Sequence, residues 1–395
     1  MGHAYVRDHA VTPQQSAVLR DILRCRTALL GGHKDLCTAC GHTEVSYNSC
    51  RNRHCPKCQS LAQARWVQHR MTRMLPTHAF HVVFTLPRQL RRLALVNPTL
   101  LFDSLFATAA ASLLELGRDP LRLGAELGVT TVLHTWTRDL RFHPHVHCIV
   151  TGGGLSLDGQ RWLAAPLHYL FPVRALGKLF RGKLLDRLQT AHRDGKLRFD
   201  GPAASYADPH RFADLVARLR RIRWVVYCKP PFGNDEQVVR YLGQYTHRVG
   251  LSNHRLLAFN EHGVTFRTRG TATATLSPTE FLRRFLLHIL PKGFVKIRHH
   301  GLFAPANVHT KLESARTLLR SAQDAAAAPN DPVGDAAAGR APDDFRELLL
   351  ALTGIDLRRC SHCGAFALVR QPLDLSPLHS TTAATTSPHP RLDTS

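Results

Sequence analysis

The segment His-Pro-His-Val-His-Cys-Ile-Val at positions 143–150 carries closely spaced imidazoles. They alternate with apolar residues, the period of a strand that is buried on one side. His145 and His147 therefore share one face, and Val146 points to the opposite, apolar one. His143 is a poorer ligand for the same ion, because its Cα would lie about 13 Å from that of His147. The pattern predicts a metal site, although 25 histidines among 395 residues also allow a polar sheet face with solvated imidazoles.

A third imidazole is expected on the preceding strand. Residues 128–136 are rich in β-branched side chains, which favours a strand, and residues 138–142 can turn the chain. A hairpin centred between Asp139 and Leu140 would bring His134 opposite His145 on the same face. Three neutral imidazoles on two adjacent strands would leave room on a divalent ion for substrate oxygens.

Two tyrosines follow about a hundred residues later. Tyr241 and Tyr245 lie within 234–247, where Asn234 or Asp235 can cap the start of a helix. At a spacing of four residues the two phenols are neighbours on one helix surface. The pair suits a tyrosine nucleophile acting beside a metal ion, and the alternative is that both rings belong to the core.

Cysteines near the N-terminus have zinc-ligand spacing. Two Cys-x2-Cys pairs can place four thiolates around one tetrahedral Zn²⁺. We therefore predict a structural zinc site made of Cys37, Cys40, Cys55 and Cys58. Four further candidate ligands lie nearby, and one alternative is that they hold a second zinc ion. They are Cys25, His33, Cys50 and His54. The later pair Cys360-x2-Cys363 cannot complete a zinc site alone and needs partners from elsewhere in the chain.

The composition points to a polyanionic partner. The formal net charge is +23 and the pI is about 10.4, a field that attracts nucleic acid. We find no run of 18 apolar residues and no signal-peptide pattern, so we expect no membrane association and a cytoplasmic protein. Ten cysteines in such a chain favour metal binding over disulfides. Basic amphipathic helices are predicted at 173–193 and 209–221, and the basic segment 291–300 suits single-stranded DNA.

The order of these motifs resembles a known superfamily. HPHVHCIV followed by YLGQYTHRVGLSNHRL resembles the HUH endonucleases. Within them the chain is similar to the two-tyrosine rolling-circle transposases of bacterial insertion sequences (the insertion-sequence-ninety-one family), which carry an N-terminal zinc-binding domain. Further matching blocks extend the likeness over roughly residues 15–310, among them SCRNRHCPKCQ at 49–59, FHVVFTLP at 80–87 and LPKGFV at 290–295.

The resemblance implies an α+β fold, with a Rep-like antiparallel sheet flanked by helices and preceded by a small zinc-binding module. We expect a zinc-binding, DNA-contacting module at 1–75 and a catalytic domain at 76–305. Residues 306–395 should hold a helix, a linker, the lone knuckle and a disordered tail rich in Ser, Thr and Pro.

The resemblance also implies a reaction. A nicking and strand-transfer enzyme would join a tyrosine, Tyr241 or Tyr245, to the 5′ phosphate of single-stranded DNA. Mg²⁺ or Mn²⁺ on His145, His147 and His134 would assist, while zinc would be structural. Gln244 is the alternative third ligand, because related one-tyrosine enzymes take a Gln from the tyrosine helix.

Two rival functions remain open at this point. One is a plasmid replication initiator or relaxase with the same chemistry, and the other is a non-catalytic zinc DNA-binding regulator. For the transposase we expect DNA ends and target DNA as partners, association with the bacterial nucleoid, and unwinding by a host helicase, since the sequence shows no Walker motif.

Overall fold

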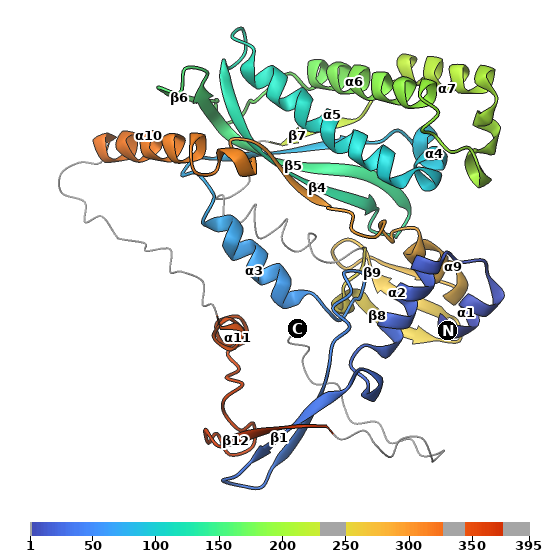
Figure 1. The fold of residues 1–395 in the computed structure, drawn as a ribbon, viewed down its shortest axis with the longest axis vertical. Coiled ribbons are helices and arrows are strands. Elements are labelled where there is room, and N and C mark those ends of the chain that lie inside the picture. The colour runs from blue at the N-terminus through green and yellow to red at the C-terminus, as the bar shows by residue number, and fades with distance from the viewer. Residues whose placement is uncertain (1, 230–249, 327–343, 374–395) are drawn as a thin grey trace. The chain divides into compact units, whose positions relative to one another are not determined.

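A computed structural model describes residues 2–229, 250–326 and 344–373 (Figure 1). Within these ranges the chain forms two compact units. The first comprises residues 2–69, 250–282 and 344–373, and the second comprises 70–229 and 283–326. The sequence had predicted three consecutive domains, 1–75, 76–305 and 306–395. That division stays a prediction. Both compact units are discontinuous in sequence, because strand pairing and hydrogen bonds bring segments from the middle and the end of the chain onto the N-terminal module.

The second unit is built on an antiparallel sheet whose strands differ in length (Figure 1). Among the described residues it has six strands, five of them in the order β11-β4-β5-β3-β7, with β6 paired to β5. The bounds are β3 Ala79–Thr85, β4 Ala125–Trp136, β5 Phe142–Ser156, β6 Trp162–Ala164, β7 Val226–Lys229 and β11 Ile297–Gly301. The longest strands, β4 and β5, lie next to each other at the centre, so the middle of the sheet is a rigid base for the side chains that it carries.

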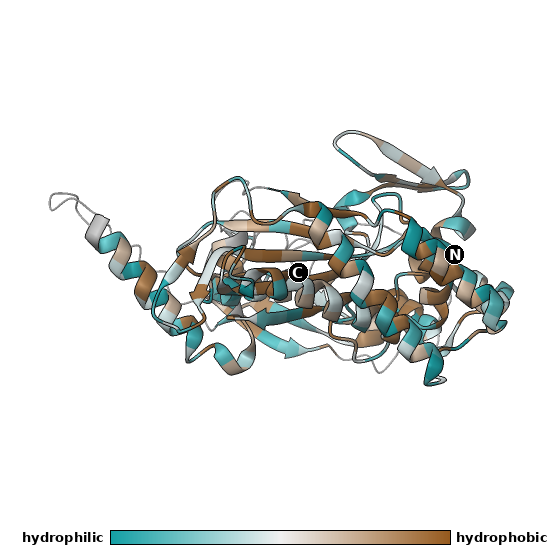
Figure 2. Cartoon of the chain, turned by 90° about the horizontal axis from the view of Figure 1, so that it is seen from above, coloured by the Kyte–Doolittle hydropathy of each residue, from teal (hydrophilic) through white to brown (hydrophobic). Residues whose placement is uncertain are grey.

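Helices bury one face of this sheet. They are α4 Arg91–Val96, α5 Pro98–Arg118, α6 Val173–Arg193 and α7 Pro209–Arg221. Residues of α6 that recur every four positions are buried, including Leu176, Phe180 and Leu184. Coloured by hydropathy, the helices of the chain carry both brown hydrophobic and teal hydrophilic residues (Figure 2). The core between these layers takes Val146, Cys148 and Val150 from β5, as their alternation predicted.

Helix α5 is long and apolar enough to cross a membrane by length and composition. Its apolar side chains instead pack in the core, since Leu105, Phe106 and Leu113 are completely buried. α5 is therefore a core helix of the second unit.

Glycines let β5 approach its neighbours closely. A Cβ at Gly152 would lie 2.3 Å from the His78 ring, and one at Gly154 would lie 2.5 Å from the Glu126 carbonyl oxygen. Side chains at these positions would push the strands apart. The glycine run therefore serves strand packing.

The first unit contains small sheets and helices. Strands β12-β1-β2 form one sheet (β1 Gly32–Cys37, β2 Thr43–Tyr47, β12 Leu368–Pro372) and β10-β9-β8 another (β8 Leu256–Asn260, β9 Gly263–Arg267, β10 Thr273–Leu276). Its helices are α1 Gly2–Asp8, α2 Pro13–Arg24 and α11 Phe345–Thr353. Thr12 caps α2 in a capping box with Gln15, which fixes where that helix starts.

The remaining helices complete the chain. α3 Ser60–Met71 and α9 Pro278–Leu286 each run across a boundary between the units, and α10 Lys311–Ala326 belongs to the second unit. Short 3₁₀ helices lie at Ala28–Leu30, Arg88–Leu90, Gly201–Ala207, Asn253–Arg255 and Pro305–Asn307. The α+β class is confirmed: helices flank an antiparallel sheet, and a cysteine-rich module precedes it. The predicted linker and tail lie outside the described residues, except for the last residues of α10.

Candidate functional site

The hairpin of β4 and β5 brings three histidines together. His134 pairs directly with His145, and Val132 pairs with His147, so the predicted register is confirmed. The turn is closed by a hydrogen bond of 3.0 Å from the Thr137 amide to the Arg141 carbonyl oxygen. One ligand nitrogen from each imidazole lies within 4.8 Å of the others. Atoms at this spacing can hold a single ion, so the donor set fits a divalent metal.

Hydrogen bonds orient two of these rings. Nδ1 of His145 donates to the His143 carbonyl oxygen at 2.6 Å, which leaves the lone pair on Nε2. Nδ1 of His147 lies 2.7 Å from Nε2 of His81. In the tautomer in which His147 donates, its Nε2 also carries the lone pair. Both rings then present Nε2 as the ligand atom.

Burial keeps the three imidazoles uncharged. The exposed fractions of His134 and His147 are only 4% and 9%. Desolvation, reinforced by the neighbouring imidazoles, holds the pKa of His134 and His147 well below the ordinary value, and burial lowers the pKa of His145 to about 4. Neutral imidazole is the form that binds metal ions. Near neutral pH the site is therefore ready for a cation without first losing protons.

His81 is a functional candidate that the sequence did not reveal. It lies on β3, next to β5, and its ring stacks on His147 with centroids 5.0 Å apart and 7° between the planes. Burial, and then the charge of Lys229 opposite it, lower the pKa of His81 to about 4. A single polar residue within the apolar run Phe80 to Phe84 was the only signal in the sequence. A neutral His81 can accept the hydrogen bond from His147 and fix its orientation.

The surroundings of His134 are aromatic and basic. Trp136 stacks on His134 with centroids 4.8 Å apart, and the Lys296 Nζ lies 5.8 Å from the centre of the Trp136 ring. The Lys296 backbone oxygen accepts from the Leu133 amide at 2.9 Å, which fixes this lysine beside the site. The segment 291–300, predicted to contact DNA, is thus partly strand β11 of the sheet, and Lys296 itself is buried.

Tyr241, Tyr245 and the alternative ligand Gln244 lie outside the described residues.

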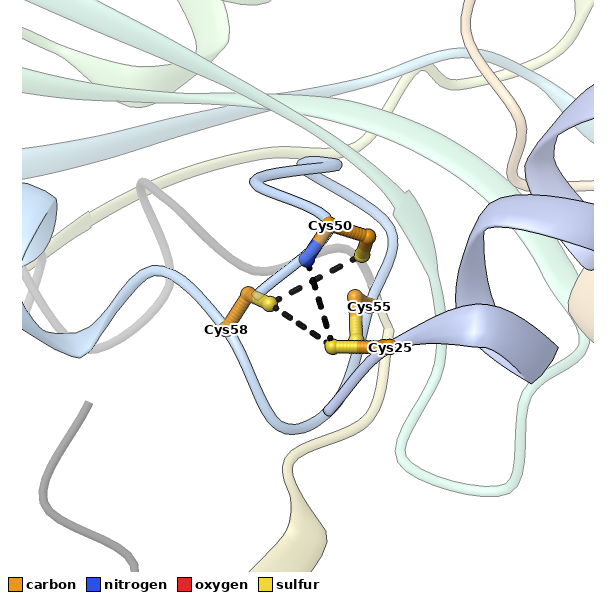
Figure 3. A group of neighbouring side chains, drawn as sticks. All are labelled: Cys25, Cys50, Cys55 and Cys58. Atoms are coloured by element: carbon orange, nitrogen blue, oxygen red, sulfur yellow. Dashed lines mark hydrogen bonds between the residues drawn. The ribbon is translucent and has the colours of Figure 1, made fainter. Parts of the chain in front are cut away.

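Four cysteines form a cluster in the N-terminal module (Figure 3). They are Cys25, Cys50, Cys55 and Cys58, whose sulfurs all lie within 4.8 Å of one another. The Sγ of Cys58 lies 3.3 Å from that of Cys25 and 3.7 Å from that of Cys50. Hydrogen bonds with the Cys50 and Cys55 thiols lower the pKa of Cys58 far below its ordinary value, so this sulfur holds negative charge readily. A set of four sulfurs at this spacing fits tetrahedral zinc.

The structure groups the predicted zinc ligands differently. Cys55 and Cys58 join Cys25 and Cys50, whereas Cys37 and Cys40 cluster with Cys360 and Cys363. The reason is the hairpin of β1 and β2. The open end of this hairpin, where Gly32 lies opposite Tyr47, is next to the first cluster. Cys37 and Cys40 lie at its turn, and Cys37 is five residues along β1 from Gly32, with a rise of ~3.3 Å per residue. The two Cys-x2-Cys pairs of the N-terminal module are therefore held apart.

The four residues of the alternative second zinc site are not all brought together either. Of its four members, Cys25 and Cys50 are in the first cluster, but the histidines are not. The Nδ1 of His54 lies 3.0 Å from the Asn52 side-chain oxygen, and the Nε2 of His33 lies 3.5 Å from the Asp35 carboxylate. These contacts give both histidines structural roles in the module.

Comparisons with known proteins find similarity to transposases. Residues 128–311 match a family model described as "Putative transposase", and residues 1–86 match one described as "Transposase zinc-binding domain". A protein of Sinorhizobium fredii named "Putative transposase y4qJ" is 42% identical over 369 residues, which are 92% of this chain and 90% of that protein. The transposase for insertion sequence element IS801 of Pseudomonas savastanoi pv. phaseolicola is 29% identical over 354 residues, or 87% and 80% of the two chains.

A solved structure is also similar in part. The conjugative relaxase TrwC, in a metal-free complex with oriT DNA, is 15% identical and covers 43% of this chain and 72% of its own. The TM-score is 0.24.

Proposed function

Because the chain belongs to the insertion-sequence transposases of the IS91 type, with their N-terminal zinc-binding domain, we propose that it nicks and rejoins single-stranded DNA through a 5′-phosphotyrosine intermediate. One observation carries the proposal. His134, His145 and His147, three neutral imidazoles on two paired central strands, converge on one point of the sheet. A site of this kind suits a reaction at a phosphodiester.

The three histidines would hold Mg²⁺ or Mn²⁺, and an all-imidazole set suits Mn²⁺ better because Mg²⁺ prefers oxygen ligands. Such an ion supplies Lewis acidity to a phosphate oxygen when it is bound. The protein adds orientation: His81 and the His143 carbonyl oxygen fix two of the rings. Lys296, held beside His134, adds positive charge that favours the approach of a phosphate.

The nucleophile that we propose is Tyr241 or Tyr245. Its phenol oxygen forms a bond to the scissile phosphorus, the bond from phosphorus to the 3′ oxygen breaks, and that oxygen leaves as a 3′-hydroxyl with the proton given up by the phenol. One phosphoester replaces another, so rejoining needs no ATP. Two tyrosines allow a second cleavage while the first 5′ end is still attached, as an element leaving by strand displacement requires. Unwinding would then fall to a host helicase.

A basic groove on the second unit offers a path for the DNA backbone. It is lined by α6, the end of α7 and the edge strand β7, with Arg174, Lys178, Arg181, Arg221 and Arg223 among its residues. The groove has a volume of about 730 Å³, and Arg174, Lys178 and Arg223 are exposed. Phosphate contacts of this kind give affinity that falls with salt and carry no sequence information.

The family match favours transposition over the replication initiator or relaxase, which would share this chemistry, and over the DNA-binding regulator. A nicking assay separates the enzyme from the regulator. Labelled single-stranded oligonucleotides from the element ends are incubated with the protein and Mn²⁺, and a covalent protein–DNA adduct is sought on a denaturing gel. An adduct is expected from the wild type. Sequence-specific binding without any adduct, with either Mn²⁺ or Mg²⁺, would favour the regulator.

A further inference from the structure

The second cysteine cluster joins the two ends of the described chain. Cys37 Sγ lies 3.7 Å from Cys363 Sγ, and Cys40 Sγ lies 3.8 Å from Cys360 Sγ. All four sulfurs lie within 4.8 Å of one another. A tetrahedral zinc ion with Zn–S bonds of about 2.3 Å places its sulfurs about 3.8 Å apart. A disulfide would need about 2.05 Å. The observed spacing is that of ligands around one ion.

The two halves of the cluster have the same local structure. In the first, the Gly41 amide donates to the Cys37 carbonyl oxygen at 2.9 Å and the Cys37 amide donates to that of His42 at 2.8 Å. In the second, the Gly364 amide donates to the Cys360 carbonyl oxygen and the Cys360 amide donates to the Ala365 carbonyl oxygen, both at 2.9 Å. Each turn uses a glycine with positive φ, +74° at Gly41 and +75° at Gly364. Each has a buried first cysteine and an exposed second one. The two cysteine turns therefore have equivalent local structures.

The strands beside the knuckles hold them in register. β12 pairs antiparallel with β1 from His33 opposite Pro372 to Cys37 opposite Leu368. The Arg370 guanidinium binds both oxygens of the Asp35 carboxylate, at 2.8 and 3.0 Å. The Thr38 amide donates to the Ala367 carbonyl oxygen at 2.8 Å. The C-terminal knuckle is thus placed by contacts that do not involve the cysteine side chains.

We propose that Cys37, Cys40, Cys360 and Cys363 bind one structural Zn²⁺ that clasps residues 344–373 to the N-terminal module. This ion is additional to the one expected at Cys25, Cys50, Cys55 and Cys58. Cys360 and Cys363 lie outside the residues that match the transposase zinc-binding domain, which end at 86. Because thiolate ligands must lose their protons and their segments must be ordered, the binding energy of the ion stabilises the clasped arrangement.

Zinc stoichiometry of the full chain tests the proposal. Protein purified without chelator should carry two zinc ions per chain, and Cys360→Ser/Cys363→Ser should carry one. Cys37→Ser/Cys40→Ser should also carry one, and the variant with all four changes should still carry one, because both pairs serve the same ion. Cys228→Ser is the matched control outside both clusters and should keep two. The single ion left in the variants shows that the module still folds.

Two results would overturn the proposal. One is a Cys360→Ser/Cys363→Ser protein that retains as much zinc as the wild type. The other is a variant with all four cysteines replaced whose loss of zinc equals the sum of the losses in the two double variants. Thiol titration under denaturing, non-reducing conditions with chelator adds a further check: all ten cysteines should react, whereas disulfides in this cluster would leave four fewer.

A cleavage experiment tests the clasp itself. A recognition sequence for a specific protease is inserted within 327–343, outside the described residues, and the full-length protein is cut. The C-terminal fragment should co-elute with the rest of the chain and should be released from Cys360→Ser/Cys363→Ser, in which the first zinc site is intact. Equal retention in both proteins would show that zinc does not hold the segment.

Discussion

Replacing His81 with Phe tests the architecture of the metal site at a residue that touches neither metal nor DNA in the proposed function. The Nε2 of His81 lies 2.7 Å from Nδ1 of His147, and the imidazole is 7% exposed. Phe keeps an aromatic ring in the same buried space and removes only the hydrogen-bond acceptor. His147 then loses the partner that fixes both its tautomer and its ring plane.

The loss of such a partner costs about 10- to 100-fold in metal affinity. That factor corresponds to about 1.4–2.7 kcal/mol. The assay is the initial rate of nicking of a labelled single-stranded oligonucleotide as Mn²⁺ is titrated. The half-saturating Mn²⁺ concentration should rise 10- to 100-fold, while the rate at saturating Mn²⁺ stays within a few-fold of the wild type, because the three ligands are all still present.

His143→Phe is the matched control. It makes the same ring replacement on β5, at an imidazole that bonds to Arg91 at 2.6 Å and lies outside the ligand cluster. It should leave the half-saturating concentration unchanged, and His81→Gln, whose amide oxygen can accept the bond, should shift it less than His81→Phe. Equal shifts in His81→Phe and His143→Phe, or a lower maximal rate at an unchanged half-saturating concentration, would refute the reasoning.

Two further predictions concern the ligands and the basic groove. His147→Ala should reduce nicking to background and leave single-stranded DNA affinity within about threefold, because binding comes mainly from the basic surface; an equal loss of binding, measured by fluorescence anisotropy, would mean that His147 supports structure instead. Arg174→Ala/Lys178→Ala should weaken binding to all DNA sequences alike. Between 50 and 200 mM salt, the slope of log affinity against log salt concentration should become shallower by about 0.7 per lost phosphate contact. An unchanged slope would exclude the groove from the DNA path.

The histidine site was predictable because its geometry is local. A strand's period of two placed His145 and His147 on one face, and a short turn placed His134 opposite them. His81 was not predictable in the same way. It reaches His147 through the pairing of β3 with β5, two strands separated by helices α4 and α5 and by β4. Nothing in the spacing of residues 79–85 specifies that pairing, so the sequence of this apolar strand did not reveal that His81 contacts His147.

The zinc ligands show where spacing misleads. Two Cys-x2-Cys pairs with 14 residues between them have the spacing of one zinc site, but the β1–β2 hairpin holds Cys37 and Cys40 at its turn. Their partners come from Cys360 and Cys363, and only the pairing of β12 with β1 brings them near. The same long-range pairing made the compact units discontinuous. Element types were predicted well because periodicity determines them, and partners were missed wherever distant strands meet.

A covalent tyrosine–DNA intermediate can be detected by mapping the adduct to a residue. A single-stranded oligonucleotide that spans the cleavage site, labelled on the 3′ side of the nick, is incubated with Mn²⁺ and either the wild type or Tyr241→Phe/Tyr245→Phe, and the adduct is digested and mapped by mass spectrometry. We expect a phosphotyrosyl peptide carrying Tyr241 or Tyr245 in the wild type and no adduct in the double variant. An adduct of undiminished yield in the double variant, or one mapped to any other residue, would contradict this expectation.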